Sequence, residues 1–255
     1  MLNFSEFNEI INEGFFIKDS IVYFDPNTSD YINTSFGKGK LKPYNAKIDN
    51  IDMFSVYNRN KKSGSNEEYS EILKAIKGKS TELTIDYDSY RKFITRTSIY
   101  MADFILKQKI DLIMVMDSSS PLVSDLVFEI NKRLPKYYDT VTYHKQIFKT
   151  PNLDNITINT MGVTLSDKNL KSIQSSIDKM KRDGYFKIQS IFTPNRKFIQ
   201  NWLEINNSVL SKIIDKNVVI VDDILTTGST ISEAGRMLYE AGASDVKGLT
   251  IIKGN

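Results

Sequence analysis

The stretch VVIVDDILTTGST, residues 218–230, decides the fold of this chain. Its apolar beginning is typical of a strand buried on both faces of a parallel sheet, and it predicts a strand at residues 218–221. Two adjacent carboxylates, Asp222 and Asp223, follow this strand, and a run of threonines, a glycine and a serine leads into ISEAGRMLYEAGA. That last stretch has helical spacing of its apolar residues. The motif therefore predicts a strand, a polar turn and a helix in succession.

Strands and helices alternate along most of the chain upstream of this motif. Strands alternating with helices are typical of an α/β fold, in which helices cover both faces of a parallel sheet. We expect Ser120 to cap one helix and Thr230 and Glu233 to form a capping box at the start of another. Apolar spacing predicts helices over residues 86–107, 121–134, 165–181 and 196–210, and strands over residues 110–117, 140–148 and 246–252.

The first 85 residues have a different character. Aromatic residues are interleaved there with Asp, Asn, Gly and Pro, and only SEILKAIKGK, residues 70–79, predicts a short helix. We therefore divide the chain into an N-terminal extension, residues 1–85, and a core, residues 86–255.

The composition excludes several kinds of site and partner. The 255 residues include no cysteine and one histidine, which excludes disulfides, thiolate metal sites and Ser-His or Cys-His catalysis. The net charge of +3 is not concentrated in a basic stretch, which speaks against a nucleic-acid partner. Without a basic leader or a run of about 18 apolar residues, the sequence predicts a cytoplasmic protein with no membrane partner.

The acid pair and the hydroxyl-rich turn together fit a phosphorylated pentose. In an open parallel sheet, ligands bind outside the carboxyl ends of the strands, where Asp222 and Asp223 are expected. Backbone amides at a helix start bind phosphate, and small hydroxyl side chains add to this site. Two carboxylates would repel the same phosphate unless a sugar separated them from it. Ribose 5-phosphate does so, because the acids can accept hydrogen bonds from O2 and O3 while the turn binds the 5-phosphate.

VVIVDDILTTGST is similar to the 5-phosphoribosyl 1-pyrophosphate (PRPP) binding motif of type I phosphoribosyltransferases. The resemblance implies that family's parallel sheet with helices on both faces, with residues 1–85 forming the hood over the acceptor. It implies catalytic roles for Asp222 and Asp223 at the ribose, and binding of Mg²⁺ by the same pair, either directly or through PRPP and water. The residues implied to bind the 5-phosphate are Leu225, Thr226, Thr227, Gly228, Ser229 and Thr230.

Two further segments are implied to take part in this site. The loop of Asp117, Ser118, Ser119 and Ser120 would face the pyrophosphate, although it also fits a plain loop with a helix cap. A mobile segment beginning near Tyr143, His144 and Lys145 would close over the site, with Lys145 as its candidate ligand, although a solvated strand end fits these residues too. Family members often have a glycine or a basic residue in the pyrophosphate loop. In this chain, backbone amides, hydroxyls or a lysine from elsewhere would have to bind the pyrophosphate.

The resemblance implies transfer of the 5-phosphoribosyl group from PRPP to a nitrogenous base or an amine, with Mg²⁺ as cofactor and release of pyrophosphate. The alternative is a non-catalytic PRPP-binding sensor or accessory protein. Thr226 stands where hypoxanthine-guanine relatives have an aspartate, which disfavours a 6-oxopurine acceptor. The doubled threonine is closest to ComF-like members, whose zinc ribbon of cysteines this chain lacks. The sequence leaves the acceptor and the oligomeric state open, a homodimer included.

Overall fold

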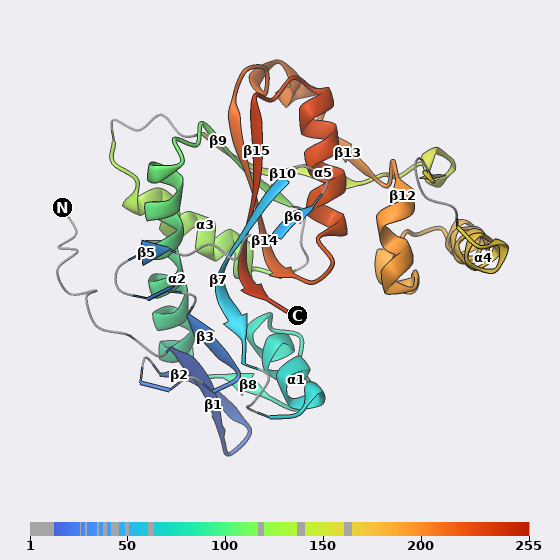
Figure 1. Ribbon diagram of the computed structural model, residues 1–255. Coiled ribbons are helices and arrows are strands. Elements are labelled where there is room, and N and C mark those ends of the chain that lie inside the picture. Colours follow the sequence, from blue (N-terminus) through green and yellow to red (C-terminus); the bar gives the residue numbers. More distant parts are fainter. Residues whose placement is uncertain are drawn as a thin grey trace.

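The structure is a computed structural model with an eight-stranded sheet at its centre and helices on both faces (Figure 1). The predicted α/β fold with a mostly parallel sheet is therefore confirmed. The strand order is β13-β10-β9-β14-β15-β7-β3, and β6 also pairs with β7. The structure describes residues 13–25, 27–28, 30–34, 36–37, 40–41, 46–48, 51–60, 64–116, 120–136, 141–160 and 165–254.

Five neighbouring strands of the sheet run parallel to one another. They are β10 (Val141–Lys149), β9 (Leu112–Met116), β14 (Asn217–Leu225), β15 (Asp245–Lys253) and β7 (Ile51–Arg59). Antiparallel strands flank this block. They are β13 (Leu203–Ile205), β3 (Ile32–Thr34) and β6 (Ala46–Ile48).

The order of these strands creates a switch point between β9 and β14. From β9 the chain passes through α3 to β10 on one side, and it later returns to place β14 on the other side of β9. At such a reversal the connections after the two central strands leave in opposite directions, which opens a crevice at their carboxyl ends. The fold therefore places its natural ligand crevice directly beside the acid pair of β14.

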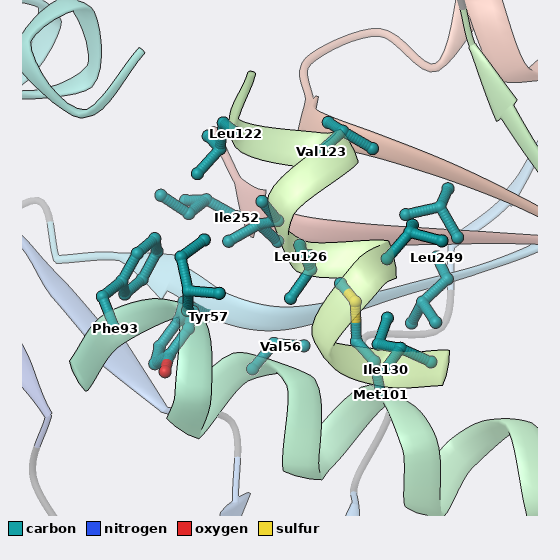
Figure 2. Close-up of a cluster of buried hydrophobic side chains, with 14 of the residues drawn as sticks. Val56, Tyr57, Phe93, Met101, Leu122, Val123, Leu126, Ile130, Leu249 and Ile252 are labelled. Atoms are coloured by element: carbon teal, nitrogen blue, oxygen red, sulfur yellow. The ribbon is translucent and has the colours of Figure 1, made fainter. Parts of the chain in front are cut away.

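Helices α2 (Tyr87–Lys107) and α3 (Leu122–Arg133) lie on one side of the sheet, and α5 (Ser229–Glu240) lies on the other (Figure 1). Because successive strand residues point to opposite faces, β14 contributes to two separate clusters of buried apolar side chains. Val219 and Val221 join the cluster with α2 and α3, part of which Figure 2 shows, whereas Val218 and Ile220 join the cluster with α5. No helix among the described residues has the length and apolar character needed to cross a membrane.

Smaller elements surround this centre. The strands β1 (Gly14–Lys18), β2 (Ile21–Asp25) and β8 (Thr84–Ile85) form a three-stranded sheet, next to which lies α1 (Asn66–Ile76). Helix α4 (Asp167–Asp183) contacts the 3-10 helix Leu153–Asn155, and β11 (Thr157–Ile158) pairs with β12 (Ile199–Gln200). The remaining short elements are β4 (Phe36–Gly37), β5 (Lys40–Leu41), and the 3-10 helices Leu153–Asn155, Ile188–Ser190, Thr193–Phe198 and Asn207–Lys212.

The N-terminal region contributes three strands, β3, β6 and β7, to the main sheet. Strand β7 pairs in parallel with β15, and the hydroxyls of Ser55 and Thr250 form a buried hydrogen bond of 2.6 Å between the two strands. The aromatic residues Phe24, Phe54 and Tyr57 are buried in the core, so their rings are not available for stacking on a ligand. Part of residues 1–85 is thus continuous with the sheet, and the role of this region as a hood stays a prediction.

The helix predicted over residues 196–210 is wrong. The chain there forms a 3-10 helix at Thr193–Phe198, the strands β12 and β13, and a second 3-10 helix at Asn207–Lys212. Asn201 adopts a φ of 61°, which a right-handed helix does not allow. The apolar residues with helical spacing are buried through strand pairing and loop packing instead, and Trp202 lies in the core.

The two predicted helix caps are also wrong. Helix α5 begins one residue before Thr230, and its N-cap is Gly228, which makes no side-chain hydrogen bond. Glu233 bonds to Arg236 and to the backbone of Asn201, so its carboxylate is not available for a capping box. The N-cap of α3 is Pro121, and the Ser120 hydroxyl lies one residue further out.

Candidate functional site

The acid pair lies within strand β14 and not beyond its end. The strand extends to Leu225, four residues past the predicted end at Val221. Adjacent strand residues point to opposite faces, so Asp222 and Asp223 present their carboxylates on different sides of β14. Asp223 Oδ2 forms an ion pair with Lys77 Nζ at 2.6 Å. Asp222 Oδ1 accepts a hydrogen bond of 2.8 Å from the Asp223 backbone N–H.

Asp222 has an unusual protonation equilibrium. Burial, and then the neighbouring charge of Asp223, raise the pKa of Asp222 from its ordinary value to about 7. The hydrogen bond from the Asp223 backbone and the charge of Lys77 oppose this rise. Near neutral pH the pair therefore exists both with and without a proton on Asp222, and carboxylates with shifted pKa values are typical of functional sites.

The hydroxyl-rich turn after β14 leads directly into α5. Gly228 has a φ of 72°, a conformation that other residues adopt at a cost, and it turns the chain into the helix at Ser229. The hydroxyls of Thr227 and Ser229 form a hydrogen bond of 2.6 Å. The first amides of a helix have no partners within it, so this turn presents backbone N–H groups beside hydroxyls. Such an arrangement binds phosphate groups.

A cavity of about 700 Å³ joins these two features. Every residue from Asp222 to Ile231 lines it, so the structure brings together Asp222, Asp223 and all of the residues predicted to bind the 5-phosphate. The carboxyl end of β9, through Met116, and the end of β10, through Ile147 and Phe148, form another part of its wall. The cavity thus lies at the switch point of the sheet, and its size is that of a small-molecule site.

Four cationic residues that were not predicted from the sequence also line the cavity. They are Lys77, Lys79, Lys149 and Arg196. They outnumber the two carboxylates, so the lining as a whole favours an anionic ligand. The one available signal was the pair of lysines in SEILKAIKGK at the end of a predicted helix.

Of the predicted pyrophosphate loop, residues 117–120, the structure describes Ser120. Asp117, Ser118 and Ser119 lie outside the described residues. Ser120 is buried, and its hydroxyl donates to the Lys77 carbonyl at 3.3 Å and accepts from the Leu122 backbone N–H at 3.3 Å.

Tyr143, His144 and Lys145 lie within strand β10, and the strand continues past them to Lys149. Lys145 is exposed at an irregularity in the pairing with β9, where its φ is 55°. It is not one of the described residues that line the cavity, whereas Lys149 at the end of the same strand is.

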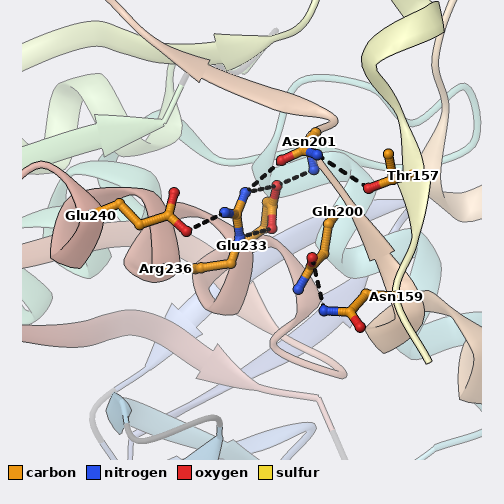
Figure 3. Close-up of polar contacts among 7 residues, drawn as sticks. All are labelled: Thr157, Asn159, Gln200, Asn201, Glu233, Arg236 and Glu240. Atoms are coloured by element: carbon orange, nitrogen blue, oxygen red, sulfur yellow. Dashed lines mark hydrogen bonds and ion pairs between the residues drawn. The ribbon is translucent and has the colours of Figure 1, made fainter. Parts of the chain in front are cut away.

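A polar network joins α5 to the segment before β13. Figure 3 shows Arg236 between Glu233 and Glu240, with bonds of 2.9 Å to Glu233 Oε1 and 2.6 Å to Glu240 Oε1. Arg236 also donates to Asn201 Oδ1 at 2.9 Å, and Asn201 bonds to Thr157. A second cavity of about 570 Å³ borders this network and shares Arg196 and Ser229 with the first. The network fixes α5, and with it the turn that begins at Gly228.

Comparison with known proteins finds a similarity over the C-terminal part of the chain. Residues 156–255 match the family model of the phosphoribosyl transferase domain, which includes strand β14, the turn and helix α5. This match, which covers residues 156–255 only, agrees with the resemblance to type I phosphoribosyltransferases predicted from the sequence. A stretch of 40 residues is 45% identical to the competence protein ComFC of Streptococcus pneumoniae (strain ATCC BAA-255 / R6), and it covers 16% of this chain and 18% of that protein.

Solved structures of phosphoribosyl transferases show a distant likeness. The hypoxanthine phosphoribosyl transferase of Trypanosoma cruzi is 15% identical with a TM-score of 0.32, and the alignment covers 64% of each chain. The Staphylococcus aureus enzyme is 14% identical with a TM-score of 0.33 and the same coverage. The glutamine PRPP amidotransferase of B. subtilis is 16% identical with a TM-score of 0.37, covering 70% of this chain and 30% of that one. This chain spans less than two thirds of the length of each of these relatives.

Proposed function

We propose that this protein transfers the 5-phosphoribosyl group of PRPP to a nitrogenous base or an amine and releases pyrophosphate. The observation that carries the proposal is the cavity at the switch point of the sheet. It is lined both by the Asp222 and Asp223 pair and by the turn from Thr226 to Thr230. The family match over residues 156–255 supports the same reaction.

The roles of the residues follow from their chemistry. Asp222 and Asp223 accept hydrogen bonds from the ribose O2 and O3 hydroxyls. The amides and hydroxyls of the turn bind the 5-phosphate at the start of α5. The nucleophile attacks C1 of the ribose while the bond to pyrophosphate breaks, and positive charge develops on the ring. The ionised carboxylates beside the ring stabilise that charge.

Mg²⁺ fits this donor set as an ion carried by the substrate. Mg²⁺ is usually bound by one or two carboxylates together with phosphate oxygens and water, and Asp222 and Asp223 both line the cavity. The described residues contain no group of three or more side chains of the kind that holds a metal ion by itself. When bound, Mg²⁺ would stabilise the negative charge of the departing pyrophosphate.

The apolar wall of the cavity favours a base over a small amine as acceptor. Ile188, Trp202 and Leu203 line this wall together with Phe148. A flat aromatic base offers an apolar face to this wall, which a small amine lacks. A cytoplasmic location and a homodimer stay predictions.

The position of Ser120 favours a second candidate, the non-catalytic PRPP sensor. Its hydroxyl is engaged with the Lys77 carbonyl and the Leu122 backbone N–H, and its side chain is buried. Ser120 in this arrangement supports the fold, so the hydroxyl is not directed to a leaving group. A protein that binds the ribose and the 5-phosphate of PRPP, but does not stabilise the leaving pyrophosphate, would bind PRPP without catalysing transfer.

One experiment separates the two candidates. Purified protein is incubated with PRPP and Mg²⁺ and a panel of nucleobases and amines, and released pyrophosphate is measured with a coupled assay. The Asp222→Asn variant serves as the matched inactive control. The transferase predicts release that depends on one acceptor and is lost in the variant. Binding of PRPP without release would favour the sensor, and absence of both binding and release would exclude both.

A further inference from the structure

The segment Lys77, Gly78 and Lys79 connects the N-terminal region to the candidate site. Lys77 caps the end of α1, and Gly78, with a φ of 67°, turns the chain away from the helix axis. A Cβ at Gly78 would meet no atom within 4 Å, so the glycine is required for its backbone conformation and not for space. We call residues 77–79 the basic segment.

The basic segment contacts both the acid pair and a residue just before α3. Lys77 Nζ lies 2.6 Å from Asp223 Oδ2. The Lys77 carbonyl accepts a hydrogen bond of 3.3 Å from Ser120 Oγ, at the end of the predicted pyrophosphate loop. Both Lys77 and Lys79 line the cavity. One short segment therefore contacts both Asp223 of the acid pair and Ser120.

The ion pair of Lys77 is shielded enough to fix the position of its charge. The Lys77 side chain is 21% exposed and the Asp223 side chain 16%, whereas the side chain of Lys74 in α1 is 51% exposed. A surface pair of lysine and carboxylate contributes little and moves freely, but shielding from solvent strengthens the interaction. The ammonium group of Lys77 is thus placed beside the ribose site before any ligand arrives.

We propose that Lys77 and Lys79 bind the pyrophosphate group of PRPP and supply the positive charge that the serine-rich loop lacks. This inference rests on the proposed function, and it adds the residues that select PRPP over ribose 5-phosphate. In PRPP the pyrophosphate is attached at C1, adjacent to the C2 hydroxyl that the acid pair is proposed to bind. A lysine that pairs with the carboxylate bound to the C2 hydroxyl therefore lies close to the pyrophosphate oxygens. Lysine is a common ligand of phosphate groups, acting as a point charge.

Binding measurements with two ligands test this role. Dissociation constants for PRPP and for ribose 5-phosphate are measured by calorimetry, with Mg²⁺, for the wild type and for Lys77→Gln and Lys79→Gln. Lys74→Gln on the same helix is the matched control, because Lys74 pairs with Glu71 outside the cavity. We expect each cavity variant to weaken PRPP binding by about ten-fold or more, since hydrogen bonds to charged groups are strong. Binding of ribose 5-phosphate should change by less than about three-fold, and Lys77→Arg should restore much of the PRPP affinity.

The outcomes of this experiment are distinct. If Lys77→Gln weakens both ligands equally, Lys77 only positions Asp223, and an equal effect of Lys79→Gln would overturn the inference entirely. Unchanged PRPP binding in folded variants would overturn it as well. If the wild type binds ribose 5-phosphate and PRPP with the same affinity, no group in the site recognises the pyrophosphate. If the wild type binds neither, the proposed function itself fails.

Discussion

Asp222→Asn is expected to stabilise the protein at pH 8 and to weaken PRPP binding at the same time. Burial and the charge of Asp223 raise the pKa of Asp222 to about 7, so the folded protein holds a proton that the unfolded chain has already released. The contribution of Asp222 to the free energy of unfolding is fully present at a pH below the ordinary pKa of an aspartate. It is lost as the pH rises through about 7. Asparagine carries no charge at any of these pH values and avoids this loss.

The structure bounds the size of both effects. One pKa unit corresponds to about 1.4 kcal/mol, so a rise of about three units limits the gain at pH 8 to about 4 kcal/mol, and partial exposure to solvent reduces it further. The hydrogen bond from the Asp223 backbone N–H is retained, because asparagine also has an Oδ1 acceptor. Loss of a charged acceptor for a ribose hydroxyl should cost about 1.5–3 kcal/mol of binding free energy, or about 10- to 150-fold in the dissociation constant.

Urea unfolding at pH 5 and pH 8, together with calorimetry of PRPP binding, checks this prediction. The gap in unfolding free energy between variant and wild type should widen from pH 5 to pH 8. Asp154→Asn is the control, because the Asp154 side chain is 85% exposed and should show no such widening. A gap that stays constant with pH would refute the argument from burial and repulsion. PRPP affinity that is unchanged in the variant would refute the role of Asp222 at the ribose.

Three further substitutions test the elements that position the site, each by urea unfolding. Gly248→Ala should lower the unfolding free energy by about 1–3 kcal/mol, because its Cβ would lie 2.4 Å from Met53 Sδ and 2.9 Å from Ile231 Cγ2. Gly228→Ala should cost about 1–2 kcal/mol at its φ of 72° and should also weaken PRPP binding in calorimetry. Glu233→Gln should cost about 1–3 kcal/mol, because it removes a charged acceptor for Arg236. A variant as stable as the wild type would contradict the corresponding argument.

The parts of the fold that the sequence predicted well have signals that are local. The apolar run at residues 218–221 lies inside strand β14, although that strand continues to Leu225, and the helical spacing after Gly228 lies inside helix α5. The strand and helix boundaries between residues 86 and 133 also agree within two residues. Burial on both faces requires continuous apolar residues, so the strand signal was strong at these positions.

The remaining features depend on contacts between residues far apart in the sequence. Strand β7 pairs with β15, nearly two hundred residues later, and no local pattern in residues 51–59 indicates that partner. Lys77 reaches Asp223 for the same reason, because the position of α1 is set by packing against the core cluster beside α2. At residues 198–203 the apolar spacing agreed with a helix, but Asn201 at positive φ turns the chain into strand β13.

Calorimetric titration of PRPP with Mg²⁺ tests the central claim most directly. The wild type is expected to bind PRPP, and a variant carrying both Asp222→Ala and Asp223→Ala is expected to lose this binding while remaining folded by circular dichroism. Absence of heat with the wild type, or an unchanged dissociation constant in the folded double variant, would contradict the assignment of the acid pair to the ribose of PRPP.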